Sequence, residues 1–490
     1  MPRRSTRIVL IVAVLLISVA LGFYVRQIIV SRPVAVMPPG VCVPKWNCTE
    51  WSFCKNGVQE RKCSDINNCG IFNNQPSETQ NCSPAVQPPQ PPHANPPPAV
   101  RPPPPPPLSV NVSLAFAERI FDSATDHCNN SLIEGPDLPV HAFRNQLSEL
   151  VLISGNAPDN YAMFGTNFNN LHRDCSQPVF RSGDKWRITD FAPQQWLFAP
   201  YVVGNVVHAL LHNEYHDPVA TNCKPGETTP ANPCWYNFIT YAQSTDGGHT
   251  FTQVAGDAKV VAILPTQWNP TDPGSGGPGN LSVRPDPHGY FSPMNIMKKG
   301  NYYYSIFQAT FFSYTGKRGS CIMRTSNLSD PHSWKMWDGH GFNISYFNPY
   351  PTEATNPDQY RCALISWDNL FENSGPVTYN TYLGKYLMVL SGIYENQGNP
   401  LTCGIWYSLS DDLINWKKPK LIIKTKFDFF PDCEPTTFKG GYPSIIDHDS
   451  TSPNFETSGR TPYLYYVLGD SPPGGSFSIL ERRRLTFTVQ

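Results

Sequence analysis

The sequence predicts an all-β protein, and its composition gives the first reason. Aromatic residues make up 12% of the 490 residues and charged residues only 15%, a balance that favours strands over solvent-exposed helices. The second reason is a motif that occurs five times, in which a proline precedes a short apolar stretch, a turn and a β-branched or aromatic strand. The five prolines are Pro139, Pro200, Pro293, Pro376 and Pro443.

A second element follows four of these five units and predicts a second hairpin in each. It reads FGTNFNNL at 164–171, STDGGHTF at 244–251, RTSNLSDPHSW at 324–334 and SLSDDLINW at 408–416. Each copy has Ser or Thr followed by Asp or Asn, whose side chains close turns by hydrogen-bonding nearby backbone. Two hairpins make a four-stranded blade, so the repeat predicts a five-bladed β-propeller over residues 130–490. A closed ring also removes exposed sheet edges.

The N-terminus predicts a membrane anchor. Residues 1–7 contain three arginines and precede an 18-residue apolar run, residues 8–25. That length is about the minimum for a transmembrane helix, and the positive-inside rule places residues 1–7 in the cytoplasm and the C-terminal region outside the cell or in a lumen. The run continues past the small residues that would precede a signal-peptide cut, so a single-pass signal-anchor is predicted. The alternative is a cleaved signal peptide and a secreted protein.

Residues 42–82 hold six of the 14 cysteines, which predicts disulfides and an oxidising compartment. Trp46, Trp51, the Trp-Ser-x-x-Cys run ending at Cys54, and Arg61 resemble the thrombospondin type 1 repeat. The resemblance implies a thin layer in which arginines stack on tryptophans and disulfides replace a hydrophobic core. It also implies a module that spaces or binds, with a surface protein as its partner. Residues 83–109 follow as a proline-rich linker, predicted to be a semi-rigid stalk.

The repeated strands carry a second resemblance. KKGNYYYSIF, YLGKYLMVLSG and the SLSDDLINW turn are similar to the five-bladed propeller glycosidases of the arabinanase, xylosidase and invertase type. STDGGHTF also resembles the Asp-box of sialidases, which implies that Asp246 closes a turn away from catalysis. The glycosidase resemblance implies carboxylates on the propeller axis, one protonating the leaving oxygen and another activating water or attacking. No cofactor is implied.

Three carboxylates are the candidate catalytic groups. Glu372, in FENSGP, precedes Pro376 by four residues and is the best positional match to the general acid of the resembled family. Asp368 is its near neighbour, and Glu214 ends the inner hairpin of the second unit. The candidate sugar-binding residues are Arg144, His212, Asn295, Tyr379 and Tyr442.

The stretch HNEYH, residues 212–216, raises the question of a metal site. Alternation along a strand puts His212, Glu214 and His216 on one face. Three such ligands on one straight strand span ~13 Å, too far for a single ion, so no metal site is predicted. Lining of a polar pocket is favoured, with exposed strand polarity as the alternative. If the strand is catalytic, Glu214 is the acid or base and His212 its partner.

Three functions remain open. The first is a surface-displayed glycoside hydrolase acting on extracellular or cell-wall polysaccharide. None of the residues directly after the five prolines is acidic, which favours a second reading, a non-catalytic propeller that binds glycans or proteins for adhesion. The third is a structural surface or envelope component. A net charge of −1 without a basic excess argues against a nucleic-acid binder.

Overall fold

The computed structural model describes residues 44–48, 51, 58–67, 75–81, 110–128, 135–183, 187–216, 235–268, 288–310, 318–370, 374–396, 399–425, 440–470 and 477–489. The chain divides into two compact units, residues 1–105 and 106–490. The predicted anchor, residues 8–25, and the predicted stalk, residues 83–109, lie outside the described residues. Within the described ranges, no helix is long and apolar enough to cross a membrane.

The first unit contains two small antiparallel strand pairs. β1 (Trp46–Cys48) pairs with β3 (Cys63–Asp65), and β2 (Val58–Glu60) pairs with β4 (Thr79–Asn81). A disulfide joins Cys48 to Cys63. The Arg61 guanidinium lies 4.3 Å from the centre of the Trp51 ring, so an arginine does stack on a tryptophan as the sequence predicted.

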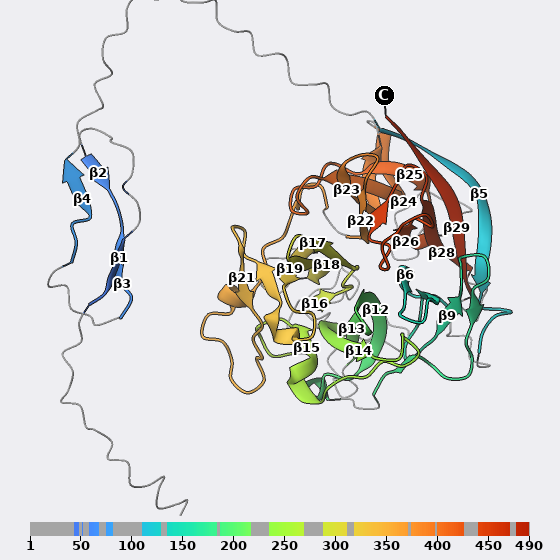
Figure 1. The fold of residues 1–490 in the computed structure, drawn as a ribbon, viewed down its shortest axis with the longest axis horizontal. Helices are drawn as coiled ribbons and strands as arrows, with labels where there is room; N and C mark the ends of the chain where they lie inside the picture. The colour runs from blue at the N-terminus through green and yellow to red at the C-terminus, as the bar shows by residue number, and fades with distance from the viewer. Residues whose placement is uncertain are drawn as a thin grey trace, which may run out of the picture. The chain divides into compact units, whose positions relative to one another are not determined.

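The second unit is all-β, as predicted. Figure 1 shows groups of strands set around a common centre, as in a β-propeller. The helical turns among its described residues are short 3-10 segments: η1 (Ile188–Asp190), η2 (Gly256–Lys259), η4 (Pro331–Ser333) and η5 (Pro357–Tyr360).

Each group of strands has one of the repeat prolines within or next to one of its first two strands. The first group is β6 (His141–Arg144), β7 (Leu150–Ile153), β9 (Ala162–Gly165) and β10 (His172–Arg173), with β8 (Asp159–Asn160) and β11 (Phe180–Arg181) paired beside it. The second is β12 (Gln194–Val203), β13 (Val206–His216), β14 (Trp235–Ser244) and β15 (Val260–Ala262). The third is β16 (His288–Phe291), β17 (Ile296–Lys299), β18 (Tyr302–Thr310), β19 (Arg318–Thr325), β20 (Lys335–Trp337) and β21 (Phe342–Ser345).

Two further groups complete the unit. The fourth is β22 (Val377–Asn380), β23 (Lys385–Asn396), β24 (Asn399–Ser410) and β25 (Lys420–Lys424), with β27 (Thr457–Ser458) parallel to β22. The last is β26 (Gly440–Ile446), β28 (Tyr463–Asp470), β29 (Phe477–Val489) and β5 (Val110–Asp122). β5 precedes residue 130, the predicted start of the domain. It supplies the outer strand that the last repeat lacks, with Val110 opposite Val489.

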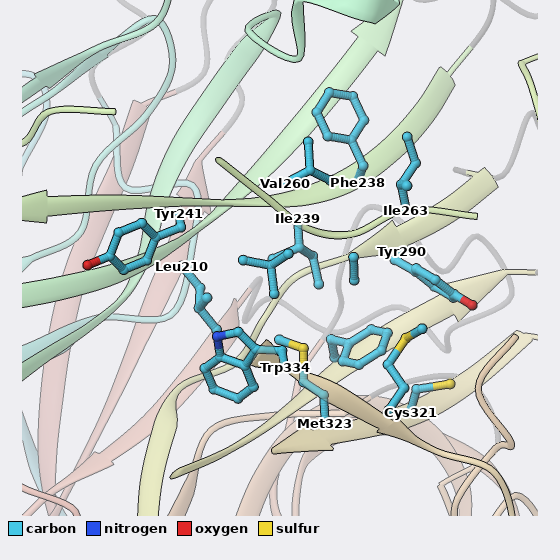
Figure 2. Close-up of a cluster of buried hydrophobic side chains, with 14 of the residues drawn as sticks. Leu210, Phe238, Ile239, Tyr241, Val260, Ile263, Tyr290, Cys321, Met323 and Trp334 are labelled. Carbon is cyan, nitrogen blue, oxygen red and sulfur yellow. The ribbon is translucent and has the colours of Figure 1, made fainter. Parts of the chain in front are cut away.

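The core lies between neighbouring groups. Figure 2 shows the cluster that joins the second and third groups, in which Phe238, Tyr290 and Trp334 are almost completely buried. Similar clusters join the first group to the second, the third to the fourth and the fourth to the last. A further one joins the last group back to the first. The apolar contacts therefore run around the whole set of groups.

The turn chemistry of the repeats is confirmed. Asp246 accepts hydrogen bonds from the Thr250 N–H at 2.9 Å and from the hydroxyls of Thr250 and Ser244, both at 2.6 Å. Asp412 accepts from the N–H groups of Ile414 and Asn415 at 2.9 and 2.7 Å. Both side chains therefore stabilise their turns, which is the structural role predicted for Asp246.

A segment between β26 and β28, residues 447–459, crosses to the other four groups, and we call it the crossing segment. The carbonyl of Pro453 accepts from the last N–H of β6 at 2.7 Å, and Asn454 Oδ1 accepts from β12 at 2.6 Å. The side chain of Glu456 accepts from β17 at 3.0 Å, and its carbonyl accepts from β22 at 2.9 Å. The four donors are the backbone N–H groups of Arg144, Val202, Lys298 and Tyr379.

Disulfides and one buried arginine tie distant parts together. Cys128 is joined to Cys175 and Cys321 to Cys362, as the cysteine content predicted. Arg482, 5% exposed, donates to Glu118 of β5 at 2.8 Å and to the Phe168 carbonyl at 2.8 Å. Arg482 thus holds the last group against the first.

We predict that Arg482→Met lowers the free energy of unfolding by roughly 2–4 kcal/mol, because it leaves a buried carbonyl without its donor and breaks an ion pair. Urea unfolding followed by tryptophan fluorescence measures the loss. Arg484→Met is the matched control, because Arg484 is exposed; its loss should stay below about 0.5 kcal/mol. Equal losses in the two variants would contradict the role given to Arg482.

Candidate functional site

Glu214 lies between two histidines on β13. The strand prediction for HNEYH is confirmed, and the three side chains share one face. His212 Nε2 lies 2.9 Å from Glu214 Oε1, and His216 Nε2 lies 3.2 Å from Oε2. The Glu214 side chain is 15% exposed, so both of its oxygens are held in a largely buried position.

His212 is held in one neutral tautomer. The backbone N–H of Ser292 donates to His212 Nδ1 at 3.2 Å. A backbone N–H can only donate, so Nδ1 carries the lone pair and Nε2 carries the proton that is donated to Glu214. The rings of Trp196 and Phe291 pack around the imidazole. His212 therefore holds Glu214 Oε1 in one fixed direction.

Asp137 is the second carboxyl of the site, and sequence reasoning did not select it. The Tyr442 hydroxyl donates to Asp137 Oδ1 at 2.9 Å. Burial raises the pKa of Asp137 to about 7, and the charge of Glu214 adds to this effect, while Tyr442 and Trp196 oppose it. Asp137 as a whole residue is half-buried.

The two carboxyls are shifted in opposite directions. Burial alone would raise the pKa of Glu214, but the hydrogen bonds from His212 and His216, together with their electrostatic attraction, outweigh it and hold that pKa below its usual value. At neutral pH Glu214 is therefore an anion, while Asp137 exchanges a proton. Such a pair can deliver or accept a proton beside a fixed negative charge.

An apolar floor explains why Asp137 is desolvated. Leu138, the next residue, is fully buried with Trp196, Phe198 and Met294 in a small cluster of its own. Met294 and Leu138 each flank a repeat proline in the sequence, so the repeat itself brings the floor together. Asp137 lies two residues before Pro139, whereas the sequence analysis considered the residue directly after each proline. An acidic residue shortly before a repeat proline is the sequence pattern that would have indicated Asp137.

The other predicted residues lie elsewhere. Glu372 lies outside the described residues, and Asp368 is exposed. Arg144 packs on Phe455 of the crossing segment, with its guanidinium 5.3 Å from the ring centre. Tyr379 is 37% exposed and packs on Tyr386 at 5.2 Å.

Arg144 and Tyr379 come near the ends of β6 and β22 that meet the crossing segment, whereas Asp137 precedes the start of β6. Asn295 is bonded through its amide to the N–H and carbonyl of Val377, both at 2.8 Å. Of the five predicted sugar-binding residues, the structure brings His212 and Tyr442 to the carboxyl pair. Sugar contact stays a prediction for all five.

The described residues contain no group of three or more His, Cys, Asp and Glu that could hold a metal ion. In this part of the chain, the two oxygens of Glu214 are occupied by imidazole nitrogens. The two carboxyls can transfer a proton and stabilise charge.

No family model matches the chain, and no curated protein matches it. Solved structures with some likeness include an endo-arabinase from Bacteroides thetaiotaomicron, with a TM-score of 0.36 and 12% identity, covering 71% of this chain and 95% of that one. An α-L-arabinanase from Cellvibrio cellulosa complexed with arabinohexaose has a TM-score of 0.38 and 10% identity, covering 71% and 91%. An α-L-arabinofuranosidase from Fusarium graminearum has a TM-score of 0.37 and 12% identity, covering 76% and 98%. At TM-scores this low, the likeness carries no conclusion about function, which is inferred from the carboxyl pair instead.

We predict that Asp137→Asn removes a pH-dependent loss of stability. The pKa of Asp137 is raised from 3.8 to about 7, so the folded state binds its proton more tightly than the unfolded state. The stability of the wild type should therefore fall, relative to Asp137→Asn, as pH rises from about 4 through 7.

The expected change in the difference across this window is roughly 2–4 kcal/mol. Thermal unfolding from pH 4.5 to 8.5 measures it, with the exposed Asp368→Asn as control. A difference that stays constant with pH would show that Asp137 titrates normally.

Proposed function

We propose that residues 106–490 form a glycoside hydrolase that cuts a glycosidic bond in an extracellular or cell-wall polysaccharide. The observation that carries the proposal is the pair Asp137 and Glu214, in which one carboxyl titrates near neutrality and the other stays ionised. Glycoside hydrolysis needs a proton donor for the leaving oxygen and a negative charge near a sugar ring that becomes cationic in the transition state. Opposed pKa shifts in two neighbouring carboxyls meet both needs.

Each carboxyl has a distinct role in this proposal. Asp137 protonates the leaving oxygen, because a carboxyl with a pKa of about 7 can carry and release a proton near neutral pH. Glu214 supplies the fixed anion that stabilises the developing positive charge. Both of its oxygens already accept hydrogen bonds, so it is better suited to stabilise charge than to attack. Glu372, which the sequence matches to the general acid of the resembled family, stays a predicted catalytic carboxylate.

The architecture around the site is also part of the proposal. Five groups of strands, and apolar clusters that link each group to the next and the last to the first, support a five-bladed propeller. The turn bonds of Asp246 support the Asp-box. Arg61 on Trp51 supports a thrombospondin type 1-like module, which would offer a surface to a protein partner. The apolar run at residues 8–25 supports a single-pass anchor that displays the domain outside the cytosol, with secretion as the alternative.

We predict that the purified protein releases a defined sugar from at least one member of a panel of polysaccharides, with soluble products identified by mass spectrometry. Asp137→Asn and Glu214→Gln should each lower kcat/KM by about 10²–10⁴-fold, because each removes one charge or proton that the transition state needs. Glu372→Gln tests this sequence-predicted carboxylate in the same assay.

Asp368→Asn, a matched carboxyl-to-amide change at an exposed site, is the control and should keep full activity. Retention of activity by Asp137→Asn would refute the assignment of the pair. If the panel yields no product but one polysaccharide is retained on the immobilised protein, the non-catalytic binding propeller replaces the hydrolase.

A further inference from the structure

We infer that Tyr442 and the backbone of Ser292 are positioning residues that clamp the two carboxyls from two different sheets. This inference rests on the proposed function, because it assigns roles to residues that contact the pair rather than the substrate. The Tyr442 hydroxyl holds Asp137 directly, and the Ser292 N–H holds Glu214 through His212. We call this arrangement the clamp.

Both members of the clamp have a positive φ angle, and both occupy the same place relative to a repeat proline. Each directly precedes a repeat proline, Pro443 or Pro293. Their φ angles are 49° for Tyr442 and 50° for Ser292, in the left-handed region that non-glycine residues rarely occupy. Seven of the described non-glycine residues have a positive φ, and these two contact the carboxyl network. Backbone strain at residues that contact a charged network indicates that these residues must hold a specific position, and the surrounding structure offsets the cost of the strain.

On the Asp137 side, the clamp holds one carboxyl oxygen. The register of β26 against β28 shifts between Gly441 and Ser444, and this bulge lies at Tyr442. The phenol donates to Oδ1. Burial raises the pKa of Tyr442 well above its ordinary value, so the phenol stays a donor throughout the working range. Trp196 is a second hydrogen-bond partner of the Asp137 carboxyl.

On the Glu214 side, the clamp orients the carboxylate without cancelling its charge. With Ser292 donating to Nδ1, His212 presents Nε2–H to Oε1 and has no lone pair there to receive a second proton. Protonated His212 would need to break the Ser292 bond. Because a backbone N–H makes this bond, the conformation of Ser292 matters and its hydroxyl does not.

A positioning role and a substrate-binding role for Tyr442 differ in kinetics. Loss of a substrate contact raises KM, whereas loss of a group that positions the acid lowers kcat and moves the pH profile. The titratable groups around Asp137 are Glu214, His212 and His216 from β13, Tyr442 from β26, and His141 on the strand that follows Asp137. Burial lowers the pKa of His141 to about 3, so His141 stays neutral in the tested range.

The first test is Tyr442→Phe, read without any substrate. The free energy of unfolding is measured against pH for the wild type and for Asp137→Asn, and likewise for Tyr442→Phe with and without Asp137→Asn. In each pair, the pH at which the difference in free energy is half complete reports the titration of Asp137. Because Tyr442 lowers the pKa of Asp137, we expect Tyr442→Phe to raise this midpoint by about one pH unit. With a substrate, kcat should fall about tenfold and KM should change less than about twofold.

The matched control is Tyr201→Phe. Tyr201 donates to Glu456 Oε2 at 2.8 Å, so this variant loses the same kind of tyrosine–carboxylate bond within the crossing segment. We expect a similar loss of stability and no change in the Asp137 midpoint. An unchanged midpoint in Tyr442→Phe, or a tenfold rise in KM with kcat preserved, would overturn the positioning role.

A second variant keeps the inference testable if Tyr442→Phe folds poorly. Valine strongly resists a positive φ, so Ser292→Val should rotate the N–H away from His212. In ¹⁵N-histidine NMR spectra, with His212→Gln as the blank, the wild type should show one neutral Nε2–H tautomer and Ser292→Val a mixture. The same spectrum in both proteins would contradict the clamp. These readouts are independent of turnover, so an inactive wild type would sink the hydrolase proposal and leave the clamp to be judged separately.

Discussion

The hydrogen bonds made by the crossing segment are the constraint on which the rest of the second unit depends. Pro453, Asn454 and Glu456 bond near the C-terminal ends of β6, β12, β17 and β22, so one short stretch fixes one strand from each of the other four groups. These strands then run in a common direction, and the residues that precede or begin them meet at the opposite end. Asp137, Trp196, Ser292 and Tyr442 are such residues. The position of the carboxyl pair is therefore set by bonds made several residues further along each strand.

The electrostatics of the site depend on which side chains bind Glu214. Its partners are two imidazoles, and His212 is fixed as a neutral donor by a backbone N–H. An arginine or lysine in the same place would have cancelled the charge and lowered the pKa of Asp137. The imidazoles hold the anion in place by hydrogen bonds, and its field acts on Asp137. Burial, usually unfavourable to a carboxylate, here becomes the means of tuning its neighbour.

Much of the fold could be predicted because its signals are local. The prolines, the turn residues such as Asp246 and Asp412, and the alternation in HNEYH each act over a few residues, and all three were read correctly. Asp137 was missed because its partners are distant in sequence, Tyr442 being 305 residues away. Strand direction was equally hidden. Arg144 and Tyr379 resemble site residues by composition, yet β6 and β22 carry them to the crossing segment. No local pattern reveals which end of a strand faces the chemistry.

The pairing of β5 with β29 has a consequence for how the protein is made. β5 is among the first strands of the domain to be synthesised, and its partner is the last. Until residues 477–489 exist, β5 presents unpaired backbone groups along 13 residues, an open edge of the kind that recruits strands from other chains. Closing so long a loop is also entropically slow. Synthesis of many copies close together would therefore favour exchange of β5 between neighbouring chains.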